Sequence, residues 1–155
     1  MHDHHYQTTI NWIGNKGEGT LTLRSYDRDL TIVVPGKPEI PATSEVSIKS
    51  NKVRYNPEEL LQAAVASCHM LSFLYICAQN EVVVTSYIDH STGTMKETAD
   101  GGGRFTEITL HPEIIIQGQV DEEKLTRLHH KANHICYIAN SCNFPINHKP
   151  VYTFL

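Results

Sequence analysis

The sequence predicts an α+β domain built from antiparallel sheets and a few helices. Alternating apolar and polar residues, typical of half-buried strands, occur in the first third of the chain and again between residues 82 and 118. Two segments with helical features, 56–80 and 121–135, separate and follow these strands. Grouped strands favour the α+β class, because a parallel doubly wound sheet needs a helix after nearly every strand.

The chain has the size and composition of one globular domain. Its 155 residues fit a single hydrophobic core, and 40% hydrophobic and 19% charged residues are ordinary globular values. A net charge of -4 provides no basic surface for phosphates, so we expect no nucleic-acid partner. We expect one domain over residues 1–155.

Two features favour a cytoplasmic protein. The opening residues, MHDHHYQ, are polar and His-rich, unlike the basic and then apolar start of a signal peptide. The one segment long enough to span a membrane, 60–78, contains several polar side chains that a protein core satisfies more readily than a bilayer. These are Gln62, Ser67, His69 and Ser72. We therefore expect a core helix and no membrane partner.

Three strands are expected in the first third of the chain, over residues 6–12, 20–23 and 30–34. Turn residues follow the first and last of them. From 35 to 55 the sequence predicts one long loop, a kind of segment that is often functional. The loop contains three cations before the next helix, Lys49, Lys52 and Arg54.

The helix over 56–80 has a strong start signal. Asn56 suits the N-cap, Pro57 suits the first helical position, and two glutamates follow where the helix dipole favours negative charge. Apolar residues then occur on every face, so we expect this helix to be buried on most sides.

The second half predicts a hairpin of two long strands, a second helix and a last strand. The segment 82–99 is expected to form one long strand, residues 100–103 a turn, and 104–118 the returning strand. Asp121 caps an amphipathic helix over 121–135. A short helical turn follows from Cys136, and residues 151–155 close the chain as a strand.

Four cysteines direct the search for function: Cys68, Cys77, Cys136 and Cys142. In a cytosolic setting they favour redox or metal chemistry over permanent disulfides. Cys68 lies near the middle of the first helix, and Cys136 opens the later helical segment. A thiol at either place is also compatible with a buried structural role.

Two segments together resemble the OsmC/Ohr family of thiol peroxidases: NPEELLQAAVASC (56–68) and HHKANHICYIANS (129–141). The resemblance covers nearly the whole chain. It implies two central helices enclosed by the strands of an intertwined homodimer, and reduction of organic hydroperoxides by a cysteine pair without a cofactor. It assigns the peroxide-attacking thiol to Cys68 and the resolving thiol to Cys136.

The chemistry of the residues agrees with this assignment. A thiolate attacks the O–O bond, and positive charge or hydrogen-bond donors favour the thiolate. We expect Arg54 to supply the donors, with Arg24 and Lys49 as the other contenders. Attack leaves a sulfenic acid on Cys68, which Cys136 condenses with to form a disulfide.

The resemblance also marks Glu58, as the carboxylate that holds the arginine by a bidentate ion pair. Ten residues separate Glu58 from Cys68, which is about 15 Å along one straight helix. We therefore expect Glu58 to act on Cys68 of the other chain in a homodimer, with sites at the subunit interface.

The sequence also favours a bulky substrate. Met70, Leu71, Phe73 and Leu74 offer apolar surface near Cys68, so we expect organic hydroperoxides to react better than hydrogen peroxide. The resemblance suggests a lipoyl-type dithiol as the reductant.

Other readings of the remaining residues stay open. Cys77 lies about 13 Å from Cys68 along the helix and is expected in the core, and Cys142 is at most an accessory thiol. His130 and His134, spaced i, i+4, would suit a zinc site, although we expect no metal. The protein could instead bind a small apolar ligand, or a metal, without catalysis.

Overall fold

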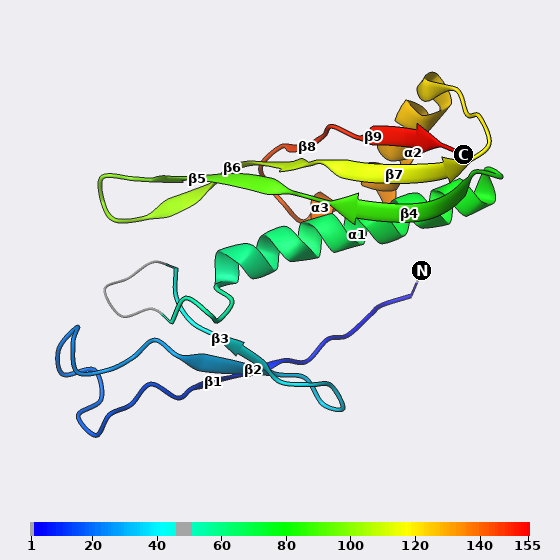
Figure 1. The fold of residues 1–155 in the computed structure, drawn as a ribbon. Coiled ribbons are helices and arrows are strands. Elements are labelled where there is room, and N and C mark those ends of the chain that lie inside the picture. Colours follow the sequence, from blue (N-terminus) through cyan, green and yellow to red (C-terminus); the bar gives the residue numbers. More distant parts are fainter. Residues whose placement is uncertain (1, 46–50) are drawn as a thin grey trace. The chain divides into compact units, whose positions relative to one another are not determined.

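The computed structural model describes residues 2–45 and 51–155, which form three helices and three sheets (Figure 1). The chain divides into two units, Met1–Leu61 and Gln62–Leu155. Helix α1, Pro57–Gln79, begins in the first unit and continues into the second. The α+β class is confirmed.

The first unit contains one antiparallel sheet in the order β1-β2-β3. Its strands are β1, Thr9–Trp12, β2, Leu30–Val33, and β3, Ile40–Ala42. Ile32 of β2 lies opposite Ile10 on one side and Ile40 on the other. The strands expected over 6–12 and 30–34 are therefore confirmed, although both are shorter than predicted.

Two expectations for the first unit are wrong. Residues 20–23 form turns, because the Ser25 hydroxyl donates to the carbonyls of Gly19 and Thr22, both at 3.0 Å, and accepts from Thr22 N. The third strand is β3, which lies inside the segment expected to be a loop. Pro41 fits there because an edge strand needs no donor from it.

Helix α1 begins as the sequence predicts. Asn56 Oδ1 accepts from Glu59 N at 2.7 Å, and Glu59 Oε2 accepts from Asn56 N at 3.0 Å, so each residue caps the other. Among the described helices, α1 alone is long and apolar enough to cross a membrane by length and composition. Its buried apolar side chains belong to the hydrophobic clusters of the second unit, as those of a core helix do.

The expectation that α1 is buried on most sides is wrong for a single chain. Leu71 and Tyr75 are 63% and 57% exposed, and Ser67 on the same line of the helix is also exposed. Residues four apart share a helix face, so the exposed residues form one stripe. The second unit covers only the opposite face.

The second unit contains two sheets that follow one another along the same long strands (Figure 1). The first, in the order β4-β7-β9, consists of β4, Val83–Asp89, β7, Pro112–Gln117, and β9, Val151–Phe154. The second, in the order β5-β6-β8, consists of β5, Thr92–Glu97, β6, Gly103–Leu110, and β8, Ile146–His148. The predicted hairpin is confirmed, but each of its arms is divided between the two sheets.

The expectation of purely antiparallel sheets is wrong. Strand β8 pairs parallel to β6, and β9 pairs parallel to β7. Both follow the helices α2, Glu122–Ile135, and α3, Tyr137–Asn140. A helical crossover returns the chain to the same end of the sheet, so the next strand enters in parallel.

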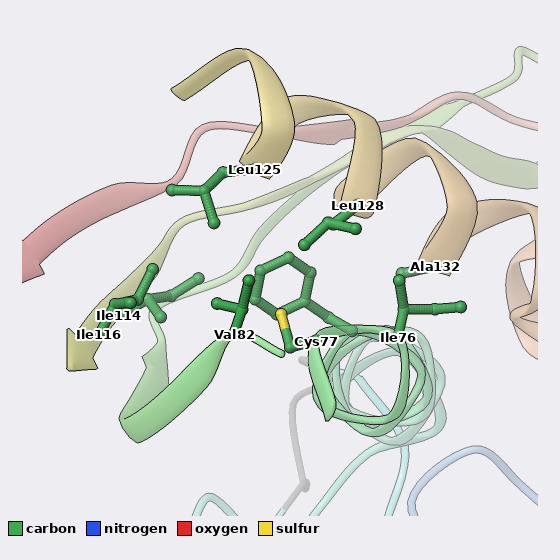
Figure 2. Close-up of a cluster of buried hydrophobic side chains, with 9 residues drawn as sticks. Ile76, Cys77, Val82, Ile114, Ile116, Leu125, Leu128 and Ala132 are labelled. Carbon is green, nitrogen blue, oxygen red and sulfur yellow. The ribbon is translucent and has the colours of Figure 1, made fainter. Parts of the chain in front are cut away.

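Two clusters of buried side chains hold α1 in the second unit. Figure 2 shows the larger one, where α1, α2 and β7 meet. It comprises Phe73, Ile76, Cys77, Val82, Ile114, Ile116, Leu125, Leu128 and Ala132. The second comprises Val65, Ile108 and Leu110, with Cys142 packed against it. Along α1, Cys68 lies between Val65 of the smaller cluster and Phe73 of the larger one.

Candidate active site

The thiols of Cys68 and Cys136 lie together in the second unit. Their sulfur atoms are 2.8 Å apart, and the Cys136 thiol donates toward Cys68 Sγ. Both are free cysteines. Cys68 comes from α1, and Cys136 stands at the junction where α2 ends and α3 begins. Packing of α1 against α2 therefore brings together two residues 68 positions apart in the chain.

The two thiols differ in exposure and in protonation. Cys136 is fully buried, whereas Cys68 is half-buried. Burial, together with the hydrogen bond to Cys68, raises the pKa of the Cys136 thiol to about 11. Cys136 therefore stays protonated near neutral pH and can donate a hydrogen bond. Cys68 is the sulfur that a solute can reach more readily.

The other two cysteines have different surroundings. Cys77 is part of the larger buried cluster, where its expected core position is confirmed, and burial raises the pKa of its thiol to about 12 (Figure 2). Cys142 is half-buried and donates to the carbonyl of Ile138 at 3.3 Å. Burial also raises the pKa of its thiol.

Arg54 and Glu58 belong to the first unit. Arg54 Nε forms an ion pair with Asp29 Oδ2 at 3.3 Å, and Arg54 Nη1 is buried without a hydrogen-bond partner. Glu58 Oε2 is buried without a hydrogen-bond partner as well. Within the described chain these two side chains form no ion pair with each other, so each has one buried polar atom available for another group.

Of the other two candidate cations, Arg24 lies among the described residues of the first unit. The backbone of Arg24 donates to Thr22 Oγ1 at 3.3 Å, within the turns of the first unit. Lys49 lies outside the described residues.

The apolar residues expected to contact the alkyl tail of a substrate differ in their exposure to solvent. Leu71 is exposed, and Met70 and Leu74 are half-buried. Phe73 is fully buried, and its ring stacks on His129 with centroids 3.9 Å apart. Phe73 is therefore a core residue, and its expected role as substrate surface is wrong for this chain.

Sequence reasoning missed a buried histidine cluster next to Cys68. His69 Nε2 and His129 Nδ1 are 2.9 Å apart in a hydrogen bond, and the His148 ring lies 4.1 Å from the His69 ring. Burial, and then neighbouring histidines, lower the pKa of His69 and of His129 to about 3. A signal was present, because His69 falls four residues after the buried Val65 and four before Phe73.

Within residues 2–45 and 51–155, no group of three or more His, Cys, Asp or Glu side chains is placed to share a metal ion. His130 and His134 of the i, i+4 pair lie on α2, where His134 is exposed. His130 lines a pocket of about 440 Å³ together with His129, Asn133 and His148.

Comparisons of the sequence and of the structure with known proteins point to one family. A family model described as OsmC-like protein matches residues 49–150. An OsmC-like protein of unknown function from Vibrio cholerae is 28% identical, with 96% of this chain and 100% of that chain covered and a TM-score of 0.85. The uncharacterized protein YmaD of Bacillus subtilis is 22% identical over 144 residues, 91% of this chain and 88% of that protein.

A more distant structure carries a functional name. An organic hydroperoxide resistance protein from Legionella pneumophila is 16% identical, with 97% of this chain and 99% of that chain covered and a TM-score of 0.68. At this identity the likeness shows a shared fold. The family model, by contrast, spans most of the chain, including both cysteines of the pair. The chain therefore belongs to the OsmC-like family.

Proposed function

We propose that this protein is a thiol-dependent peroxidase that reduces organic hydroperoxides to alcohols. The observation that carries the proposal is the contact of 2.8 Å between Cys68 Sγ and Cys136 Sγ. A half-buried thiol directly beside a buried, protonated one suits an attacking and a resolving cysteine. Relatives of the same fold that are named as hydroperoxide resistance proteins support the substrate class.

The proposed cycle has three steps. The Cys68 thiolate attacks the hydroperoxide, the O–O bond breaks, and the alkoxide takes up a proton and leaves as the alcohol, with a sulfenic acid on Cys68. The Cys136 thiol then displaces water from that sulfenic acid, which forms the Cys68–Cys136 disulfide. A dithiol, of the lipoyl type by family resemblance, finally reduces this disulfide and becomes a disulfide itself.

Arg54 and Glu58 are proposed to complete the site. The unpartnered Nη1 of Arg54 would donate to the thiolate or to the peroxide, and the unpartnered carboxylate oxygen of Glu58 would hold the arginine in place. We further propose a cytoplasmic homodimer in which Glu58 acts on Cys68 of the partner chain. The exposed side chains of Leu71 and Tyr75 on α1 support such a contact between subunits.

The deciding experiment is a steady-state peroxidase assay with dithiothreitol as reductant. Cumene or tert-butyl hydroperoxide is expected to be consumed faster than hydrogen peroxide, because an alkyl tail gains from apolar surface near Cys68. Cys142→Ser is the matched control and should keep the wild-type rate. No consumption, or an equal or reversed preference, would overturn the proposal.

The second candidate is a protein that binds a small apolar ligand without catalysis. A pocket of about 340 Å³ between α1 and the start of β4 favours it, and its lining is mostly apolar, with Leu74, Ala78, Val82 and Val84. Such a protein would show affinity for an apolar probe and no turnover of hydroperoxide.

A further inference from the structure

A second contact joins the same two helices that carry the cysteine pair. His69 directly follows Cys68 on α1, and His129 lies seven residues before Cys136, on the helix α2 that ends at Cys136. The bond between His69 Nε2 and His129 Nδ1 is 2.9 Å long and buried. Each ring is therefore fixed to the helix that positions one of the two thiols.

This contact is directional, unlike the apolar packing between α1 and α2. Apolar contacts between residues such as Phe73 and Leu128 alone permit small rotations and shifts of one helix on another. A hydrogen bond between two ring nitrogens holds only over a narrow range of distance and angle. It therefore sets the rotation of α1 against α2, and with it the direction of Cys68.

The rings are themselves held in place. His129 stacks on Phe73 at 3.9 Å, and the His148 ring lies 4.1 Å from that of His69. The outer nitrogens, His69 Nδ1 and His129 Nε2, are buried without hydrogen-bond partners. Breaking the mutual bond would therefore leave four buried ring nitrogens unsatisfied among the described residues, which opposes helix movement.

We propose that His69 and His129 are positioning residues that hold Cys68 and Cys136 at the separation needed for disulfide closure. The inference rests on the proposed peroxidase function for its chemical step. In that step the Cys68 sulfenic acid, formed by the hydroperoxide, condenses with the Cys136 thiol to give the disulfide and water. The histidines contact neither reactant, and they act through the two helices.

The test measures the thiol pair directly, by equilibrating the full-length protein in glutathione redox buffers and quantifying the Cys68–Cys136 disulfide. His129→Leu should lower the effective concentration of the pair by about tenfold, because closure depends on orientation. His129→Asn, which keeps a polar group near the Nδ1 position, should restore most of it. His134→Leu, an exposed neighbour on α2, is the control and should match the wild type.

A kinetic measurement separates positioning from reactivity. In the Cys136→Ser background, oxidation of Cys68 to the sulfenic acid should proceed at the same rate whether or not His129→Leu is also present. In proteins that retain Cys136, closure of the disulfide should be slower with His129→Leu than without it. If His129→Leu does not fold, His69→Phe keeps a flat ring without the nitrogens and is expected to show the same loss.

The outcomes are distinct for the two proposals. A folded His129→Leu or His69→Phe protein with an unchanged glutathione equilibrium would overturn the positioning role. A wild-type protein that forms the disulfide in glutathione buffer but consumes no hydroperoxide would overturn the peroxidase function, and the equilibrium would still report on the histidines.

Discussion

At the scale of single residues, substitution of each thiol and mass spectrometry test which cysteine attacks the peroxide and which one resolves the sulfenic acid. Cys68→Ser should abolish turnover, because it removes the reachable sulfur. Cys136→Ser should permit one attack and leave Cys68 as sulfenic acid or a higher oxide, because no thiol remains beside it. Peptide mapping of peroxide-treated wild type should show a Cys68–Cys136 disulfide. A bridge that includes Cys142 instead would contradict the assignment.

The buried histidines predict acid sensitivity of the fold. His69 and His129 have their ordinary pKa of 6.5 in the unfolded chain and a pKa of about 3 when folded. Between these values the unfolded chain binds protons that the folded chain excludes, so the free energy of unfolding falls as the pH falls from 6.5 toward 3. Each ring contributes up to about 1.4 kcal/mol per pH unit to this fall in the free energy of unfolding.

Urea unfolding at pH 7 and pH 5 measures this effect. Wild type should lose more free energy of unfolding between the two pH values than His129→Leu, in which one titrating ring is absent. His134→Leu removes an exposed histidine of the same helix and should lose as much as wild type. Equal losses in wild type and His129→Leu would contradict the prediction.

The resemblance to a family pointed to Cys68 and Cys136, which the fold brings into contact, but not to the histidines, and the reason is physical. Cys68 and Cys136 lie in segments whose order and spacing can be read directly from the chain. The contact of His69 with His129 depends on how two helices are rotated against each other, which no local pattern determines. Arg54 is similar, since its partner Asp29 is distant in sequence.

At the scale of elements, the start of α1 should respond to a single change. Asn56→Ala removes the acceptor of the Glu59 amide and should lower the free energy of unfolding by about 1 kcal/mol. Glu123→Ala, at an exposed first-turn position of α2, should change it by less than about 0.5 kcal/mol. Chemical denaturation of both variants checks the difference, and a loss for Asn56→Ala no larger than the one expected for Glu123→Ala would contradict the capping role.

Both long helices could be predicted because their signals are local. Caps at Asn56 and Asp121 and apolar spacing within each segment are sufficient. Strands β3 and β8, of three residues each, could not be predicted, because they exist only through pairing with β2 and β6. The parallel direction of β8 and β9 likewise follows from the path of the chain and not from the composition of those strands.

At the scale of the whole molecule, two observations favour a homodimer. Leu71 and Tyr75 are large hydrophobic side chains on the exposed stripe of α1, and Glu58 Oε2 is buried without a hydrogen-bond partner among the described residues. Glu58 and Cys68 are on one helix, α1, about 15 Å apart along its axis. If two α1 helices pack antiparallel across a twofold axis, Glu58 of each chain can approach Cys68 of the other.

Subunit mixing tests this arrangement. Glu58→Ala and Cys68→Ser chains are each expected to be inactive alone, and equal mixing under exchange should restore about a quarter of the wild-type rate, because half of the dimers then carry one intact site of two. Cys68→Ser mixed with Cys136→Ser is the control. The structure places both thiols of the pair in one chain, so that mixture should recover no turnover. Absence of recovery in the Glu58→Ala mixture, despite heterodimers detected by native mass spectrometry, would place Glu58 and Cys68 in the same chain's site.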